Sequence, residues 1–343
     1  MTIRDHNSQH DYADSLPLIS KSATVTDVET MDRDRQKEIR TALLELGKDH
    51  GFAHAIPTSG KLDWERIFEA ATKASRGLAS QIGALHDRFE RAHPALLRVV
   101  FETDHPFDFA AGQYVSIRYD GRTRPYSVAS SPTRGDTELC IRRVPEGRLS
   151  PRLCDELSVG NQITVRGPNG HLLLENPSKR DIVFVATGTG VAPMKSMIDY
   201  SFETGRDEYR GEERDVWLFL GAAWEDDLPY HDAFLELASD HENFHYVPCL
   251  SREPWLTAWN GETDYIQDAL LKYVDERALA DAAFGRHMAE MLENRPAVTV
   301  DARIDPGQLE VYACGINAMV YSLETAVQRL GVPDRHVHCE GYG

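Results

Sequence analysis

The pattern of apolar and polar residues changes twice along the chain, and the middle part has the clearest pattern. Between residues 81 and 177, short apolar runs alternate with turns that contain glycine or proline. The runs cover residues 96–102, 114–118, 138–144 and 162–166. Many short strands at this spacing are typical of an antiparallel barrel or sandwich. We therefore predict an antiparallel β-barrel over residues 81–177.

From residue 178 to residue 343 the pattern becomes strand, turn and helix. Apolar runs with strand character cover residues 182–186, 216–220, 244–250 and 311–313, with helical stretches between them. This alternation is typical of an open, doubly wound parallel sheet. The predicted fold is thus a two-domain α+β arrangement, in which the barrel is followed by an α/β domain of the nucleotide-binding kind.

Residues 1–80 are polar, acidic and free of cysteine, and we predict a helical N-terminal extension there. Thr26 and Glu29 have the spacing of a capping box, which predicts a helix from this point toward Gly51. A second helix is predicted from apolar positions that share one face: Trp64, Ile67, Phe68 and Ala71. Two short helices bury little by themselves, so we expect them to pack on the rest of the molecule or to mediate assembly.

Composition and charge narrow the function classes. Lys and Arg total 37 against 55 Asp and Glu, which gives a net charge of −18 and argues against nucleic-acid binding. The five cysteines are widely separated, so neither a zinc nor an iron–sulfur signature is present and we predict no metal site. No apolar run is long enough to span a membrane, and the first residues lack signal-peptide character. We expect a soluble, cytoplasmic protein.

A glycine-rich turn lies between a predicted strand and a predicted helix in the α/β domain. The turn contains Thr187, Gly188, Thr189 and Gly190, and Pro193 suits the first helical turn. Glycines allow close approach of the backbone, and a helix N-terminus offers unpaired N–H groups to a pyrophosphate. The same pattern also serves as an ordinary tight turn, so the turn alone does not establish nucleotide binding.

Two segments of the predicted barrel carry side chains suited to a flat, phosphate-bearing ligand. The first is a strand end with Arg124, Pro125, Tyr126 and Ser127. An arginine fork can hold a phosphate, a tyrosine face can stack on a ring, and a serine hydroxyl can bond a ring nitrogen. The second segment precedes a short helical stretch and offers backbone N–H groups to an anion: Gly147, Arg148, Leu149 and Ser150.

Four motifs in this order resemble the ferredoxin–NADP reductase family of flavoproteins over roughly residues 81–343. They are Arg-Pro-Tyr-Ser at 124–127, Gly-Arg-Leu-Ser at 147–150, the turn that starts at Gly188, and Tyr-Ala-Cys-Gly at 312–315. Smaller matches lie at 109–114, where Ala111 replaces a proline of the family, and at 139–143 and 167–170.

The resemblance implies a role for each motif in binding FAD. It implies that Arg124 binds the FAD phosphates, that Tyr126 stacks on the isoalloxazine and that Ser127 approaches flavin N5. It also places three residues at the flavin pyrophosphate: Gly147, Leu149 and Ser150. The family's adenine-stacking tyrosine has no counterpart here, because Val144, Pro145 and Glu146 stand in its place.

The resemblance also implies a catalytic group and a mobile aromatic cover. It places Cys314, which precedes Gly315, beside the nicotinamide, where it works with Ser127 and Glu340. The chain ends in a segment similar to the plant-type Glu-x-Tyr ending, which implies that Tyr342 covers the flavin face. Gly343 is one residue more than that ending has. Cys314 also fits a simple buried position, and the tail also fits an unstructured end.

The choice of nucleotide rests on residues similar to the family's NADP-binding stretch: Ser251, Arg252, Tyr265 and Gln267. An arginine fork suits the 2′-phosphate of NADPH. The family's lysine before the tyrosine is absent, and the segment at 221–224 lacks a basic residue, so NADH stays possible. We favour NADPH.

The resulting hypothesis is an FAD-dependent reductase that transfers electrons between NADPH and an external one-electron carrier, ferredoxin or flavodoxin. A second hypothesis is the reductase component of an oxygenase, or an NAD(P)H-dependent flavin or ferric reductase. A third is a flavin-free regulatory or assembly protein on the same fold, in which residues 1–80 are the working part.

Overall fold

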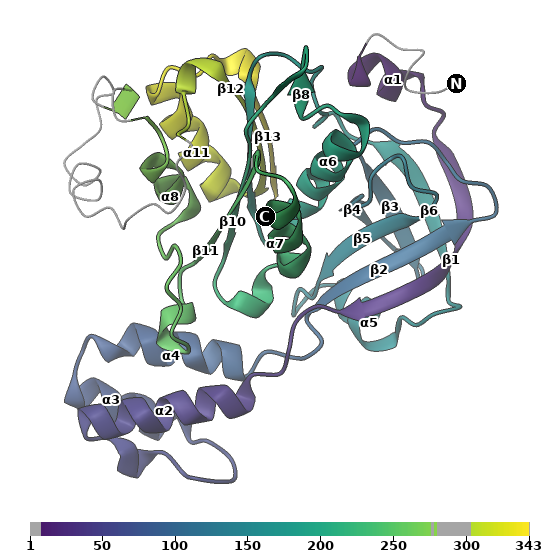
Figure 1. The fold of residues 1–343 in the computed structure, drawn as a ribbon. Coiled ribbons are helices and arrows are strands. Elements are labelled where there is room, and N and C mark those ends of the chain that lie inside the picture. Colours follow the sequence, from purple (N-terminus) through teal and green to yellow (C-terminus); the bar gives the residue numbers. More distant parts are fainter. Residues whose placement is uncertain (1–7, 276–277, 280–302, 343) are drawn as a thin grey trace.

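Two sheets of different strand arrangement organise the chain in the computed structural model, which describes residues 8–275, 278–279 and 303–342. The first is a six-stranded antiparallel sheet in the order β4-β3-β6-β1-β2-β5, which curls into a nearly closed barrel (Figure 1). The second is a five-stranded parallel sheet in the order β11-β10-β7-β12-β13. The predicted fold class is therefore confirmed.

The barrel encloses an apolar core because alternate residues of its strands point inward. Leu139 and Ile141 of one strand pack there with Val99 and Val165 of two others. The strands are β1 Ile19–Thr30, β2 Leu96–Thr103, β3 Tyr114–Tyr119, β4 Arg122–Ser127, β5 Thr137–Arg142 and β6 Gln162–Asn169. Helix α5, Ser150–Glu156, adds Leu153 to the same core, and α1, Gln9–Ser15, precedes β1.

The segment at Thr26 and Glu29 is a strand, and the helix predicted to start there is wrong at this end. Both residues lie in β1, which pairs antiparallel with β2 and with β6. Ala23 and Val25 are buried while Thr24 and Thr26 are exposed, a period of two that favours a strand over the short capping-box signal. The prediction of one helical extension over residues 1–80 is therefore wrong, because the barrel begins within it.

A helical insertion, residues 36–89, leaves and re-enters the barrel between β1 and β2, where Thr30 pairs with Leu97. It consists of α2 Gln36–His50, α3 Trp64–Ala74 and α4 Leu78–Phe89. Helix α2 ends at Gly51, whose φ of 77° is the left-handed conformation that glycine adopts readily. The predicted second helix is confirmed as α3, with Ile67 and Ala71 buried, although Phe68 is 43% exposed.

The parallel sheet is covered by helices on both faces, and each face has its own apolar core. Its strands are β7 Asp181–Thr187, β10 Val216–Ala222, β11 Phe244–Leu250, β12 Leu309–Ile316 and β13 Val337–Tyr342. The helices are α6 Val191–Thr204, α7 His231–Asp240, α8 Ile266–Lys272 and α11 Asn317–Arg329. A small hairpin joins β8, Glu208–Tyr209, to β9, Glu212–Glu213.

The segment expected to cover the flavin, residues 337–342, is an edge strand of this sheet. It is β13, and it runs parallel to β12 with Glu340 opposite Cys314 and Tyr342 opposite Ile316. Gly343 lies outside the described residues. Among the helices of the described part, none has the length and apolarity needed to cross a membrane.

Candidate functional site

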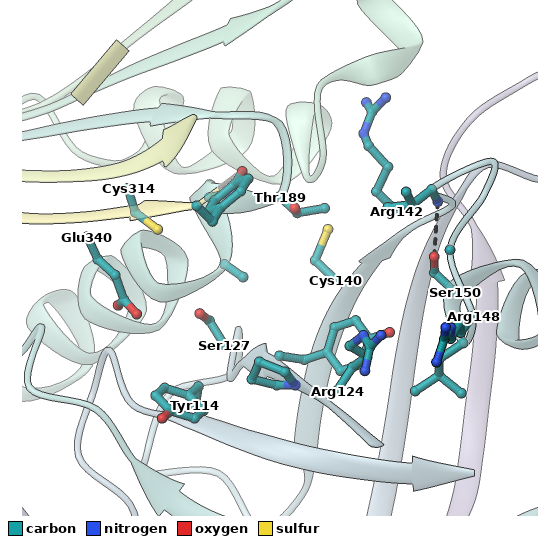
Figure 2. A pocket seen from close by; sticks show the side chains of 18 of the residues that line it. Tyr114, Arg124, Ser127, Cys140, Arg142, Arg148, Ser150, Thr189, Cys314 and Glu340 are labelled. Atoms are coloured by element: carbon teal, nitrogen blue, oxygen red, sulfur yellow. Dashed lines mark hydrogen bonds between the residues drawn. The ribbon is translucent and has the colours of Figure 1, made fainter. Parts of the chain in front are cut away.

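A pocket of about 760 Å³ lies where the barrel faces the carboxyl ends of the parallel strands, and we call it the interdomain pocket. Figure 2 shows Arg124, Arg148 and Ser150 toward one end of it and Ser127, Cys314 and Glu340 toward the other. The lining comprises Tyr114, Arg124, Pro125, Tyr126, Ser127, Cys140, Arg142, Val144, Glu146, Gly147, Arg148, Leu149, Ser150, Thr189, Gly190, Ala192, Cys314, Glu340 and Tyr342.

Edge strand β4 brings four predicted residues to the interdomain pocket. Pro125 is tolerated there because β4 has a ladder partner, β3, on one side only. Arg124 donates to the carbonyl of Thr123 at 2.8 Å, and no carboxylate in the described part of the chain pairs with it. Burial raises the pKa of Tyr126 to about 12, so its ring stays neutral. The guanidinium of Arg124 is therefore available to an anion.

The loop at 147–150 forms the adjoining part of the barrel wall. Ser150 accepts a hydrogen bond from the Val144 N–H at 3.0 Å, and Leu149 is anchored in the barrel core. A Cβ at Gly147 would lie 2.9 Å from the carbonyl oxygen of Val144, so the tight loop requires glycine. Arg148 is exposed and, within the described residues, has no carboxylate partner. The wall therefore presents two unpaired cations, Arg124 and Arg148.

The opposite wall is formed by the turn after β7 and by the ends of β12 and β13. Tyr342 accepts a hydrogen bond from the Gly190 N–H at 2.9 Å and donates one to the Thr187 carbonyl at 2.8 Å. A Cβ at Gly190 would lie 2.2 Å from the carbonyl oxygen of Cys314, and one at Gly315 would lie 2.2 Å from Thr187 Oγ1. Glycine is required here by close packing between the turn and β12.

Burial controls the ionisation of Cys314 and Glu340 on this wall. It raises the pKa of the Cys314 thiol to about 12, so the thiol is neutral and acts by position rather than as a nucleophile. Burial also raises the pKa of Glu340 above its ordinary value. Both groups lie at the end of the interdomain pocket that Ser127 approaches (Figure 2). Three of the four predicted catalytic residues therefore line the same end of the interdomain pocket, and the fourth, Tyr342, lines the pocket as well.

A second pocket, of about 350 Å³, adjoins the first, and we call it the nucleotide-loop pocket. The two pockets share Arg142, Thr189 and Tyr342. The second contains the predicted residues Thr187, Gly188, Ser251, Tyr265 and Gln267, together with Gly221, Ala222, Ala223, Asp227, Cys249, Asp264, Ile266, Ile316 and Met319.

Three predicted binding residues do not line either pocket. Arg252 is exposed next to Ser251, outside the lining residues. Pro193 is buried in the first turn of α6, and Gly315 lies behind Thr187. For Pro193 and Gly315 the structure therefore gives a packing role.

Sequence reasoning did not single out Cys140 and Arg142 as site residues. Both lie on β5, where Leu139 and Ile141 are buried in the barrel core, so the alternation of the strand directs Cys140 and Arg142 away from that core. Arg142 donates to Asp227 at 2.8 Å across the two domains. The period of two along β5 could have identified Cys140 and Arg142 from the sequence. No sequence pattern pointed to Asp227 as the partner of Arg142.

Comparison with known proteins gives matches over both domains. The family model described as an oxidoreductase FAD-binding domain matches residues 92–173, and that of an oxidoreductase NAD-binding domain matches residues 184–325. A ferredoxin–NADP reductase B from Sorangium cellulosum is 31% identical over 80% of this chain and 97% of its own length.

Other relatives match over a smaller part of the two chains. The reductase component of phenol 2-monooxygenase from a Pseudomonas species is 33% identical over 54% of this chain and 51% of its own length. The chain spans about half the length of the first relatives that it matches. An Amycolatopsis cytochrome P450 reductase has the same fold, with a TM-score of 0.61, 23% identity, and coverage of 95% of this chain and 71% of its own.

Proposed function

Because this chain belongs to the ferredoxin–NADP reductase family, we propose that it is an FAD-dependent reductase that transfers electrons between NADPH and a one-electron carrier protein. One observation carries the proposal. The interdomain pocket and the nucleotide-loop pocket share a wall at Thr189 and Tyr342, so ligands in the two pockets would meet there. Ser127, Cys314 and Glu340 line the interdomain pocket as well.

The interdomain pocket fits FAD in charge and size. Its volume is in the range of ligand sites, and its barrel wall holds two arginines without carboxylate partners among the described residues. We propose that Arg124 holds the phosphates, that Tyr126 stacks on the ring system and that Gly147, Leu149 and Ser150 line the pyrophosphate. FAD, when bound, would supply a group that accepts a hydride and gives up electrons one at a time to the carrier.

The parallel-sheet wall would orient the nicotinamide. Tyr342 is held over the pocket by Thr187 and Gly190, so the ring must move aside before a nicotinamide can stack. The neutral Cys314 thiol and the Ser127 hydroxyl would position the reacting ring without competing as nucleophiles. A carboxylate at Glu340 would stabilise the positive charge that a nicotinamide gains when it gives up a hydride.

We propose NADPH as the preferred nucleotide. Ser251 and Tyr265 line the nucleotide-loop pocket and Arg252 lies beside Ser251, an arrangement suited to a 2′-phosphate. Lys272 bonds the nearby Asp264 and Glu262 at 2.6 and 2.7 Å and so offsets one of their two negative charges. NADH remains the competing nucleotide in the test below.

An acidic carrier, ferredoxin or flavodoxin, is part of the proposal. Arg118 on β3 and Arg166 on the neighbouring β6 are exposed and have no carboxylate partner among the described residues, in a chain whose net charge is −18. Such cations favour docking of an acidic surface. A cytoplasmic location also belongs to this proposal.

A second candidate function is the reductase component of an oxygenase. It is favoured by relatives such as the phenol 2-monooxygenase component, which is 33% identical. The two functions share the chemistry at the interdomain pocket and differ in the carrier. Reduction of purified ferredoxins and of an oxygenase component by this protein would separate them.

The test is an anaerobic titration of the purified protein with NADPH and with NADH, followed by absorption spectroscopy. We expect a yellow protein whose flavin bands bleach at a lower concentration of NADPH than of NADH. A colourless protein that binds no added FAD would support the flavin-free alternative instead. Bleaching by NADH alone would overturn the proposed nucleotide.

A further inference from the structure

The helical insertion shares its apolar core with the loops of the nucleotide-loop pocket. Trp224, which follows β10, is 3% exposed and belongs to the core of the insertion. Trp255 and Leu256, which follow β11, pack against that core. The same two loops present Ala223 and Ser251 to the nucleotide-loop pocket. Each loop therefore contributes residues both to the pocket and to the core of the insertion. Figure 1 shows the short helical turn after β11 next to α4.

A buried ion pair joins the insertion to the second of these loops. Arg35 immediately precedes α2, and its Nη1 and Nη2 donate to the two carboxylate oxygens of Glu253 at 2.7 and 2.8 Å. Both side chains are 0% exposed. Only an arginine provides this bidentate fork, and loss of Arg35 would leave the buried Glu253 carboxylate without its cation. Arg35 itself also contacts Asp226 at 3.3 Å and Glu38 at 2.8 Å.

Glu253 also holds the two loops to each other. It accepts hydrogen bonds from the Glu225 N–H at 2.8 Å and from Thr257 Oγ1 at 2.9 Å. Beside it, the N–H groups of Ser251 and Arg252 donate to the carbonyls of Ala222 and Ala223 at 3.2 and 3.0 Å. The backbone of Ser251 and Arg252 is thus fixed by a set of contacts that ends at Arg35.

The charge state of Glu253 suits this role. Burial alone would raise its pKa, but the hydrogen bonds from Arg35 and the Glu225 N–H hold the pKa below its ordinary value. A second attachment uses the other end of the insertion, where Arg88 of α4 and Arg91 contact Asp226. The loops are therefore held at both ends of the insertion.

We propose that Arg35 and Glu253 are positioning residues for the nucleotide, through which the helical insertion holds Ser251 and Arg252 in the geometry that binds the ribose end of NADPH. This inference rests on the proposed function, because it requires the nucleotide to occupy the nucleotide-loop pocket. Neither residue lines the nucleotide-loop pocket. The insertion thereby gains a role in nucleotide selection.

The test uses the full-length protein with bound flavin and follows dye reduction by NADPH and by NADH. For Glu253→Gln we expect the KM for NADPH to rise about tenfold or more, the KM for NADH to rise less than about threefold, and turnover at saturation to stay within about twofold. Arg35→Lys keeps the positive charge but loses the bidentate fork. We therefore expect the KM for NADPH to rise more than the KM for NADH here too, but by a smaller factor than in Glu253→Gln.

Asp32→Asn is a matched control. Asp32 is 6% exposed, and its carboxylate accepts the N–H groups of Ala95 and Leu96 and contacts His93, so its bonds are made on the barrel side and not to residues 251–257. We expect Asp32→Asn to leave the ratio of the two KM values unchanged. Amide hydrogen exchange supplies a second readout, in which residues 251–257 should exchange faster in Glu253→Gln and not in Asp32→Asn.

The outcomes separate this inference from the proposed function. Unchanged KM values and unchanged exchange in Glu253→Gln would overturn it, as would an equal loss with both nucleotides that Asp32→Asn reproduces. If Arg252→Ala selectively raises the KM for NADPH while Glu253→Gln does not, the proposed function stands and the inference fails. If Arg252→Ala raises the KM for both nucleotides equally, Arg252 does not recognise the 2′-phosphate. Amide hydrogen exchange of residues 251–257 then still decides the role of Glu253. Should Glu253→Gln not fold, Arg35→Lys decides by the same criteria.

Discussion

The two walls of the interdomain pocket are built by different means. The barrel wall includes two short contiguous segments that present Arg124 and Arg148, which have no carboxylate partner in the described part of the chain. The parallel-sheet wall consists of strand ends and a turn whose backbones are in close contact, as at Gly190 and Cys314. The first wall supplies charge for binding, and the second supplies position for reaction. Side-chain changes should therefore weaken binding at the barrel wall, whereas backbone crowding should disrupt geometry at the other.

The largest expected effect comes from crowding the parallel-sheet wall with Gly190→Ala. The new Cβ would lie 2.2 Å from the carbonyl oxygen of Cys314, and neither backbone can yield cheaply. We expect a loss of about 1–3 kcal/mol in the free energy of unfolding and a fall in turnover of about 100-fold. Thermal unfolding and dye reduction measure the two effects.

Gly83→Ala is the control for that substitution. Gly83 lies in α4 with open space around the added Cβ, so the variant should gain roughly 0.5–1 kcal/mol of stability through helix propensity. If Gly190→Ala behaves like Gly83→Ala, the turn is not packed against β12 as described.

Arg124→Ala tests the barrel wall. Loss of a charge-assisted partner for phosphate should weaken FAD binding by about 1.5–3 kcal/mol, or roughly 10- to 150-fold. Reconstitution of the apoprotein with FAD, followed by flavin fluorescence, measures this affinity. Arg134→Ala is the control, because Arg134 pairs with Asp136 and does not line the interdomain pocket. Full FAD affinity in Arg124→Ala would remove this residue from the site.

Glu340→Gln probes charge on the parallel-sheet wall and should slow hydride transfer about tenfold with little change in flavin content. Burial raises the pKa of Glu340, so its carboxylate forms only at a higher pH than for an ordinary glutamate. In the parent, the rate of hydride transfer should rise with pH through that raised pKa. The variant should stay at the lower rate across this range. Stopped-flow rates that match the parent at every pH would contradict the role.

The smallest expected effect concerns the ring that covers the pocket. Tyr342→Ser should tighten nicotinamide binding by about 0.5–1.5 kcal/mol, because the nucleotide no longer displaces an aromatic ring. A charge-transfer band should appear, and the preference for NADPH should narrow. Tyr342→Phe keeps the ring and loses only the bonds to Gly190 and Thr187, so it should remain near the parent. Absorption spectra that are identical in all three proteins would show that the ring does not cover the pocket.

The contiguous parts of the site could be predicted from the sequence because their chemistry is local. The segments at 124–127 and 147–150 carry their own turn and strand signals, and the structure brings both to one wall. The turn at 187–190 was identified by glycines whose close contact with β12 the structure explains. The contacts that could not be predicted join residues far apart in the sequence. The ion pair of Arg35 with Glu253 joins residues 218 positions apart, and no local sequence pattern predicts it.

The error at β1 has a similar cause. Thr26 and Glu29 satisfy a local helix-start pattern, whereas their strand is stabilised by ladders to β2 and β6, which lie far along the chain. A variant shortened to begin near Gln81 would lack β1 from the centre of the barrel sheet, so it would not be expected to fold. The helices alone are therefore not separable by a simple truncation.

The place where the helical insertion joins the barrel has an evolutionary consequence. Thr30 pairs with Leu97 and the Met31 N–H donates to the Leu96 carbonyl at 2.9 Å, so the insertion occupies the loop of a β-hairpin. A hairpin loop can lengthen at a conformational cost that grows only slowly with its length. The same barrel could thus gain or exchange such an insertion while its strand register and its wall of the interdomain pocket stay the same. The exchange would change the preference for NADPH over NADH without any change inside the pockets.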